Sequence, residues 1–499
     1  MEVVSAENAK RIDSISINKI GIPSIVLMEC AAHEIYSSIL HKGEKFLICC
    51  GRGNNGGDGL ALARKLILAN KNVIVLICGS EKSATEEFNI NLNILIKLNA
   101  NIIYLNSIED INKKVSGIFN SVDLIVDSIF GIGLNRDISG LYYDIINLIN
   151  NSNKVIISID VPSGLDSNNG SIHGICVKAN ETYTVEVYKK GFFVGRSSEF
   201  LGQLKLIKIG FPNEVIKECS ENIRLLSNDD YKSMIPKRSI NSHKGNFGKV
   251  AILAGSKGYT GAAYITTEAT VRTGSGLVTL ITDKEVQSVL SSRFIEAMTL
   301  NYEENDKIEK LISGIDVIAC GPGLDTTELS HKKLEHILKI SKAPIVLDAD
   351  ALNIISKDKS LLSLVRGRAI CTPHPGEMSR LVNKSIDEIE NNRIDICREF
   401  AEKNQVVVVL KGHNTIISDG KEVIINRSGN SKMASGGMGD CLTGIIASLI
   451  GQKKKDNLFE CAVLGCYIHG LAGDKLSEGR YSVNARDIIE KISNILEYI

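Results

Sequence analysis

The sequence predicts an α/β protein with two domains, each a mainly parallel sheet covered by helices. A chain of 499 residues is too long for one compact core, so two or three domains are expected. Short apolar runs, followed by loops and helix-like stretches, recur along the chain. Glycine-rich loops at residues 51–59 and 434–440 lie in different halves, which indicates one nucleotide-handling domain in each.

The first expected elements form a βαβ unit between residues 46 and 78. Residues 46–50 are a short apolar run, residues 60–69 have the pattern of a helix, and residues 73–78 follow as a second strand. Further apolar runs at 124–126, 155–159 and 182–187 are typical of strands buried on both faces. A parallel sheet with helices on both sides follows from this alternation.

A break in the pattern between residues 211 and 239 predicts a domain boundary near residue 220. Pro212 and Pro236 bracket a polar stretch there. We therefore expect domains at residues 1–217 and 225–499. Strands are expected at 250–254, 277–281, 317–319, 345–347 and 406–410, and a buried helix at 442–450 behind the second glycine loop.

Composition excludes several classes of protein. Lysine plus arginine and aspartate plus glutamate number 58 each, so no basic field exists to hold nucleic acid. The sequence contains no run of about 18 apolar residues, so no membrane span is expected. The first ten residues carry Glu2 and Glu7 and no apolar stretch, so no secretory signal is expected. The twelve cysteines form no CxxC pair and predict buried reduced thiols in a cytoplasmic protein.

The first glycine loop combines a weak dinucleotide pattern with a more informative polar cluster. Gly51, Gly53 and Gly56 match the dinucleotide fingerprint, but the second strand ends at Cys78 and Gly79 without the acid that would hold a ribose. Residues 54–59 contain two amides, a carboxylate and three glycines, which suit a ligand or a cation. The alternative is an Asn-Gly-rich turn.

Two further strand ends carry acids that belong to the same expected edge. Asp127 follows the run at 124–126, and Asp160 follows the run at 155–159. Ligands of open α/β sheets bind at the carboxyl ends of strands, so these acids and the first glycine loop are expected to form one pocket. Each aspartate alone could instead be a helix cap or a turn residue.

Residues 1–215 resemble the NAD(P)HX epimerases, through segments 27–32, 54–59, 130–133 and 159–164. The resemblance implies a Rossmann-like three-layer domain, with Asp160 as candidate acid or base. It also implies a potassium ion held by Asn55, Asp127 and Ser163. The family usually has a small polar residue where Ile132 stands. The residues implied to contact the hydrated dinucleotide are Asn54, Asn55, Gly56, Gly57, Asp58, Gly131, Ile132, Gly133, Leu134, Asn135, Arg136, Asp137 and Asp160.

The second glycine loop leads into an apolar helix and ends on Asp440. Its glycine amides can cradle a phosphate, and Asp440 can take a proton from a hydroxyl, although it could also merely cap the helix. His374 is fixed between two prolines, which favours a ligand contact over simple packing. Asp348 and Asp350 could help to hold magnesium or could be turn carboxylates.

Residues 235–499 resemble the ribokinase-like superfamily, and more closely its NAD(P)HX dehydratase branch. Segments 255–263, 321–323, 372–377 and 437–440 carry this resemblance, which implies a ribokinase-like three-layer domain. The implied contacts to the hydrated nucleotide are Ala262, Gly323, His374 and Asp440. The implied contacts to ADP or ATP are Lys411, Gly412, His413, Asn414, Thr415, Asn430, Ser431, Lys432, Met433, Ala434, Ser435, Gly436, Gly437, Met438 and Gly439.

Together the two resemblances imply repair of hydrated NADH and NADPH. The first domain interconverts (R)- and (S)-NAD(P)HX, and the second dehydrates the S epimer with ADP or ATP, its Mg²⁺ and Asp440 as base. The partners implied are NADHX, NADPHX and ADP or ATP, with homo-oligomers and without nucleic acid or membrane. A kinase of a small vitamin alcohol, with a non-catalytic N-terminal nucleotide-binding module, is the alternative. The sequence does not decide between ADP and ATP or between NADHX and NADPHX. It also leaves open whether substrate passes directly from one site to the other.

Overall fold

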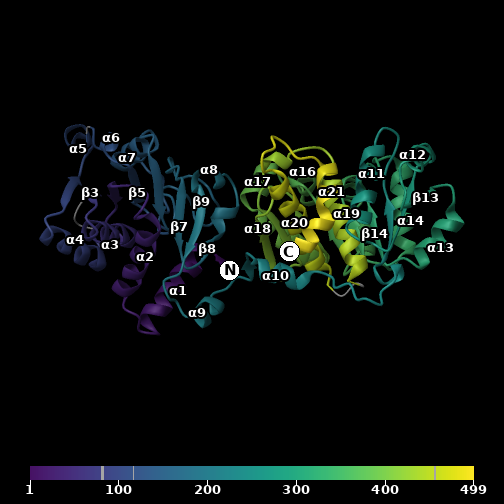
Figure 1. The fold of residues 1–499 in the computed structure, drawn as a ribbon, viewed down its shortest axis with the longest axis horizontal. Helices are drawn as coiled ribbons and strands as arrows, with labels where there is room; N and C mark the ends of the chain where they lie inside the picture. The colour runs from purple at the N-terminus through teal and green to yellow at the C-terminus, as the bar shows by residue number, and fades with distance from the viewer. Residues whose placement is uncertain (80–83, 116, 454–456, 499) are drawn as a thin grey trace. The chain divides into compact units, whose positions relative to one another are not determined.

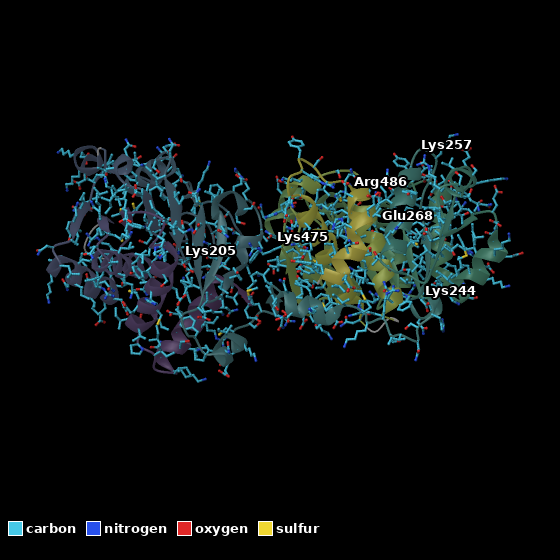
Figure 2. All side chains as sticks on the ribbon, viewed as in Figure 1. Lys205, Lys244, Lys257, Glu268, Lys475 and Arg486 are labelled. Atoms are coloured by element: carbon cyan, nitrogen blue, oxygen red, sulfur yellow. The ribbon has the colours of Figure 1, made fainter. Side chains whose placement is uncertain are left out.

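The computed structural model describes residues 1–79, 84–115, 117–453 and 457–498. The chain forms two compact units, Met1–Glu221 and Asn222–Ile499. Figure 1 shows helices and strands alternating along the chain in both units, and the predicted α/β class is confirmed. Charged side chains such as Lys257 and Arg486, which are 85% and 83% exposed, extend into solvent (Figure 2).

The sheet of the first unit is parallel, as predicted. Within the described residues its seven strands run in the order β4-β3-β2-β5-β6-β7-β9, and every pair is parallel. The strands are β2 (Lys45–Cys50), β3 (Asn72–Cys78), β4 (Asn101–Leu105), β5 (Leu124–Ser128), β6 (Val155–Ile159), β7 (Glu181–Val185) and β9 (Gln203–Ile207). A separate parallel pair joins β1 (Val3–Val4) to β8 (Tyr188–Lys189).

Helices cover both faces of this sheet. In β2, Phe46 and Ile48 belong to one hydrophobic cluster, and Leu47 belongs to another on the opposite face. The first cluster includes α2 (Ser24–Ile39), α3 (Asn54–Leu68) and α4 (Glu86–Lys97), and the second includes α5 (Ile108–Lys114) and α7 (Leu141–Asn150). The remaining helices are α1 (Ala6–Asn18), α6 (Ile118–Ser121), η2 (Lys190–Phe193), α8 (Ser198–Leu201) and α9 (Asn213–Glu218).

The sheet of the second unit is larger and mixed. Its ten described strands run in the order β10-β19-β18-β17-β16-β15-β14-β11-β12-β13. They are β10 (Ile223–Arg224), β11 (Lys249–Leu253), β12 (Leu277–Thr282), β13 (Met298–Asn301), β14 (Val317–Cys320), β15 (Ile345–Leu347), β16 (Ala369–Cys371), β17 (Val407–Leu410), β18 (Thr415–Ser418) and β19 (Val423–Asn426). The last three form an antiparallel meander that the sequence pattern did not reveal, because short connections rather than helices join them.

The helices of the second unit pack most closely at α11 (Thr260–Arg272) and α19 (Met438–Gln452). A Cβ atom at Gly444 would lie 2.3 Å from the carbonyl oxygen of Thr266, so glycine permits this approach. The other helices are α10 (Asn228–Met234), η3 (Lys244–Asn246), α12 (Lys284–Leu290), α13 (Asn305–Ser313), α14 (Glu328–Ile340), α15 (Ala349–Lys357), η4 (Lys359–Leu364), α16 (Pro375–Val382), α17 (Ile386–Asn391), α18 (Arg393–Asn404), η5 (Ser431–Met433), α20 (Leu458–Leu476) and α21 (Ala485–Tyr498).

Both glycine segments enter their helices earlier than the sequence predicts. Helix α3 begins at Asn54 rather than at residue 60, and α19 begins at Met438 rather than at residue 442. Glycine disfavours helix, but close packing overrides this preference, since a Cβ atom at Gly56 would lie 1.8 Å from the carbonyl oxygen of Gly51. Across the described residues, none of the helices combines the length and apolar character that crossing a membrane requires.

Candidate functional site

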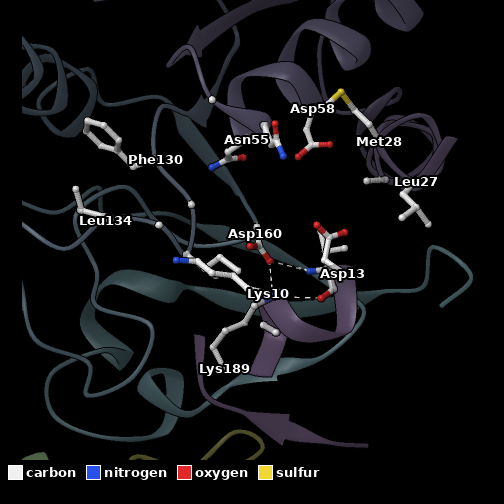
Figure 3. Close-up of a pocket in the computed structure, with 18 of the residues that line it drawn as sticks. Lys10, Asp13, Leu27, Met28, Asn55, Asp58, Phe130, Leu134, Asp160 and Lys189 are labelled. Atoms are coloured by element: carbon white, nitrogen blue, oxygen red, sulfur yellow. Dashed lines mark hydrogen bonds and ion pairs between the residues drawn. The ribbon is translucent and has the colours of Figure 1, made fainter. Parts of the chain in front are cut away.

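A pocket of about 650 Å³ lies in the first unit at the carboxyl ends of β2, β5 and β6 (Figure 3). The start of α3, the loop after β5 and the turn after β6 all reach it, as predicted for one shared edge. The predicted residues that line it are Asn54, Asn55, Asp58, Gly131, Ile132, Gly133, Leu134, Asn135, Arg136 and Asp160. Gly56 and Gly57 are buried in the packing of α3, and Asp137 does not line the pocket.

The start of α3 supplies backbone groups to this pocket. Gly53 is the N-cap residue, and its backbone is extended without a side-chain cap. The first N–H groups of a helix have no partner within it and carry a partial positive charge. Asn54 and Asn55 follow at the pocket wall, so this helix start can bind an anionic or carbonyl-bearing ligand.

Asp160 is held by an ion pair that sequence reasoning missed. It stands in the left-handed region at φ 62°, directly after β6. Its Oδ1 accepts hydrogen bonds from Thr184 Oγ1 at 3.2 Å, from the backbone N–H of Val185 at 3.1 Å and from Lys189 Nζ. Lys189 is only 2% exposed. The only sequence feature that could have pointed to this ion pair is the position of Lys189 shortly after the apolar run 182–187.

Asp127 and Ser163 contact each other directly. Asp127 is fully buried in β5, and its oxygens accept bonds from Ser163 Oγ at 2.6 Å and from the backbone N–H of Ser163 at 2.9 Å. Ser158 Oγ also donates to it at 2.8 Å. Burial raises the pKa of Asp127, although these hydrogen bonds oppose the rise. A position within a strand contradicts the helix-cap alternative for this residue.

Asn55 lines the pocket, and only the nitrogen of its side-chain amide has a hydrogen-bond partner among the described residues. Its Nδ2 donates to the carbonyl oxygen of Ile159 at 3.2 Å, while its Oδ1 is buried and has no hydrogen-bond partner in the described part of the chain. Phe130 and Ser163 are joined by a 2.9 Å bond from the Phe130 N–H to Ser163 Oγ. Asn55 and Phe130 line the pocket, whereas Ser163 and Asp127 are buried and do not line it.

In the second unit, a buried ion pair lies beside the second glycine segment. Lys411 Nζ donates to Asp348 Oδ1 at 2.6 Å, and Thr443 Oγ1 donates to Asp348 Oδ2 at 2.8 Å. Burial opposes the charged forms, but each partner outweighs it, so the pKa of Asp348 is lowered and that of Lys411 is raised. A Cβ atom built at Gly439 would lie 3.2 Å from Lys411 Nζ. Lys411 therefore faces the start of α19.

Asp440 lies in the first turn of α19 and has a different environment. Burial and the charge of Asp348 raise its pKa to about 6. The N-cap residue of α19 is Gly437, which has no side-chain cap, so the structure does not support the alternative that Asp440 caps this helix. A carboxylate with a pKa near neutrality is suited to accept and return a proton.

Side chains that the sequence did not reveal form hydrogen bonds with the two segments predicted to bind the nucleotide, 411–415 and 430–439. Asp474 Oδ1 accepts from Asn430 Nδ2 at 2.7 Å, and Asp474 Oδ2 accepts from the N–H of Gly429 at 2.9 Å. Arg393, 2% exposed, donates to the carbonyl oxygens of Leu410 and Lys411 at 3.0 and 3.1 Å. Ser435 and Gly436 stay exposed, whereas Met433 and Met438 pack against the core.

Three other predicted residues have local structural roles. His374 is the N-cap of α16, and its Nδ1 accepts from the N–H of Gly376 at 3.0 Å. Burial and the charge of Lys411 lower the pKa of this half-exposed histidine. Gly323 and Ala262 lie together, because a Cβ atom at Gly323 would be 3.0 Å from that of Ala262.

Asp348 and Asp350 both have partners within the protein, and the expectation that they help to hold magnesium stays a prediction. Asp348 is engaged by Lys411 and Thr443, and Asp350 Oδ2 accepts from the N–H of Asp325 at 2.9 Å. In the portion of the chain that is described, histidine, cysteine and acidic side chains form no group of three suited to a metal ion. Asp350 itself lies in the first turn of α15.

Comparison with known proteins matches each unit to a family model. Residues 24–191 match the model described as YjeF-related protein N-terminus. Residues 250–494 match the model described as NAD(P)H-hydrate dehydratase. The two matched segments lie in different compact units.

Relatives of nearly the same length contain both segments. The chain is 34% identical to the bifunctional NAD(P)H-hydrate repair enzyme Nnr of Moorella thermoacetica, covering 99% of this chain and 97% of that relative. It is 33% identical to the enzyme of the same name from Dictyoglomus turgidum, covering 98% and 97%. A crystal structure of a ribokinase-like superfamily protein from Enterococcus faecalis matches with a TM-score of 0.52 and 32% identity, covering 56% of this chain and 96% of that one. The predicted ribokinase-like fold is thereby confirmed for the second unit.

Proposed function

This chain belongs to the family of bifunctional NAD(P)H-hydrate repair enzymes, and on that basis we propose how its two units divide the repair. The substrates are NADH and NADPH that carry a hydroxyl at C6 of the nicotinamide ring, as R and S epimers. Residues 1–217 form the epimerase domain, and residues 225–499 form the ADP- or ATP-dependent dehydratase domain. The observation that carries the proposal is a pocket in the first unit lined by Asn54, Asp58 and Asp160, together with Asp440 beside Lys411 in the second.

In the epimerase domain, the substrate contacts are residues 54–58, residues 131–137 and Asp160. The helix start at Asn54 faces the anionic part of the dinucleotide. Asp160 acts as acid or base at C6. Its Oδ1 accepts three hydrogen bonds, and Oδ2 keeps its lone pairs for a ligand. Lys189 and Val185 fix its orientation.

A potassium ion in this domain is a separate part of the proposal. Potassium prefers oxygen ligands. The unused Oδ1 of Asn55 and the hydrogen-bonded pair of Asp127 and Ser163 would supply them. The ion would supply positive charge next to the bound dinucleotide. Asp127 already accepts several hydrogen bonds, so Asn55 Oδ1 is the atom whose burial the ion explains best.

In the dehydratase domain, phosphorylation makes the C6 hydroxyl a good leaving group. Asp440 removes the hydroxyl proton, and the oxygen then attacks the terminal phosphorus of ADP or ATP, displacing AMP or ADP. Loss of the C6 phosphate and a C5 proton restores the ring double bond. Residues 411–415 and 430–439 bind the nucleotide, while Ala262, Gly323 and His374 contact the nicotinamide nucleotide. Mg²⁺ bound to the nucleotide phosphates would balance their charge.

An assay on mixed epimers tests the division of labour. The protein is incubated with (R)- and (S)-NADHX plus ADP, and NADH absorbance is followed. We expect both epimers to be recovered as NADH. Recovery of the S epimer alone would remove the epimerase assignment. Phosphorylation of a vitamin alcohol without NADH recovery would favour the kinase alternative.

Location and assembly complete the proposal. We place the protein in the cytoplasm, which free buried thiols such as Cys49 and Cys50 support. Homo-oligomers are proposed from the family resemblance, and light scattering on the whole chain tests them. Parallel assays with ADP and ATP, and with NADHX and NADPHX, determine the preferred donor and coenzyme.

A further inference from the structure

The pocket of the first unit contains three carboxyl groups with unequal partners. Asp160 is ion-paired with Lys189. Asp58 of α3 and Asp13 of α1 line the same pocket, yet neither has a hydrogen bond or an ion pair within the described residues. Figure 3 shows all three gathered in one part of the pocket. Asp13 precedes the segment that the family model matches, and nothing in the sequence singled it out.

The surroundings favour a proton on Asp58. Burial, and then the negative charges of Asp160 and Asp13, raise its pKa well above the usual value. Burial, Glu87 and Asp160 also raise the pKa of Asp13. Asp160 is ion-paired with Lys189 while Asp58 has no such partner in the described part of the chain, and two carboxyl groups with such different surroundings are suited to opposite roles in proton transfer.

Two positive groups that line the pocket, Lys189 and Arg52, have partners other than Asp58 and Asp13. Lys189 Nζ is used by Asp160, Thr184 and the carbonyl oxygen of Val185. Arg52 Nε donates to the carbonyl oxygen of Gly79 at 2.7 Å. Lys10 also lines the pocket, and the Cys50 thiol lies close enough to Asp58 for their charges to interact.

We propose that Asp58 is the general acid of the epimerisation, that Asp160 is its base, and that Asp13 keeps the proton on Asp58. This inference rests on the proposed epimerase function and assigns one further catalytic residue to it. Asp13 is a positioning residue that acts through its charge.

The step balances without an added reagent. Asp58 donates its proton to the C6 hydroxyl oxygen while the C6–O bond breaks, and water leaves. The N1 lone pair forms an N1=C6 double bond, so the ring becomes a cation. A water molecule then adds to C6 from the other face and gives its proton to Asp160. The proton has moved from Asp58 to Asp160, and the reverse reaction or exchange with solvent resets both groups.

The test measures R-to-S conversion against pH in the whole chain, with dehydration of (S)-NADHX as the internal control. In the wild type, the rate of R-to-S conversion is expected to fall as the pH rises and Asp58 loses its proton. Asp58→Asn is expected to lower kcat for epimerisation by about 100-fold or more, with dehydration unchanged. Asp58→Glu, which keeps an acid, should retain part of the rate.

Asp13→Asn tests whether Asp13 acts through its charge, because a purely structural role would not shift the pH profile of epimerisation. Removing its negative charge lowers the pKa of Asp58, so the alkaline limb should shift to lower pH with little change in KM. Glu34→Gln removes an equal charge from an exposed position on α2 and should leave the profile in place. If the wild type does not convert the R epimer, the proposed function fails. This inference is wrong if the wild type converts the R epimer and Asp58→Asn keeps the full rate. It is also wrong if Asp13→Asn leaves the alkaline limb of the pH profile in place.

Discussion

At the scale of single residues, the neighbours of a carboxyl group decide its chemistry. Asp348 and Asp440 influence each other electrostatically in one buried cluster. The 2.6 Å bond from Lys411 lowers the pKa of Asp348, whereas burial and the charge of Asp348 raise that of Asp440 to about 6. Asp348 is thus a fixed counter-ion, and Asp440 is the group that can exchange a proton near neutrality.

Asp440→Asn should abolish dehydration of (S)-NADHX and leave epimerisation nearly unchanged. Loss of a general base costs about 100- to 10,000-fold in rate. Asp160→Asn should do the reverse. Separate assays of the two steps check both variants, and a joint loss in either variant would contradict the division between the units.

Dehydration should also lose rate in acid. The pKa of Asp440 is raised to about 6, and the base must be ionised. Activity is therefore present above that value and is lost as pH falls through it, by about tenfold per pH unit. A kcat/KM profile of the dehydration step between pH 5 and 8, with stability monitored in parallel, tests this. A rate that stayed constant down to pH 5 would exclude Asp440 as the base.

Removing potassium should slow epimerisation selectively. Replacing K⁺ by choline leaves Asn55 Oδ1 buried without a partner, so substrate conversion should fall while dehydration persists. Asn55→Ala should lose the dependence on K⁺. Equal rates of epimerisation in both salts would argue against the ion.

At the scale of elements, glycines let helices lie close to their neighbours. Gly56 permits the turn at Gly51 to contact the start of α3, and Gly444 permits α19 to contact α11. The sequence marks these positions only as glycines. Propensity favours a later helix start, while the packed neighbour decides where the helix begins.

Gly444→Ala should destabilise the second unit. The added Cβ atom would fall 2.3 Å from the carbonyl oxygen of Thr266, and such overpacking costs about 1–3 kcal/mol. Gly314→Ala is the matched control, because the nearest atom there lies 4.0 Å away. Urea unfolding of both variants measures the free-energy difference, and equal stabilities would contradict the packing argument.

At the scale of the whole molecule, two compact units each contain one of the proposed sites. Residue 221 ends the first unit, and β10 begins the second by pairing with β19. The pocket belongs to the first unit alone, and the Asp348–Lys411 cluster belongs to the second.

Separate chains of residues 1–221 and 222–499 should therefore each keep one activity. The first should interconvert NADHX epimers, and the second should dehydrate only the S epimer. Mixing the two chains should restore full recovery of NADH. Loss of either activity in a folded piece, judged by circular dichroism, would show that its site depends on the other unit.

The sequence alone determined the α/β class of both halves and the places of the two glycine segments, and it singled out Asp127, Asp160 and Asp440 as candidate site residues. These features are local, because apolar runs and glycine motifs can be recognised within a few residues. Only the tertiary structure brought Lys189 to Asp160, Lys411 to Asp348 and Asp474 to Asn430. Such partners are far apart in the chain, and no local pattern specifies them; folding decides which charges share a buried space and therefore which of them can carry a proton.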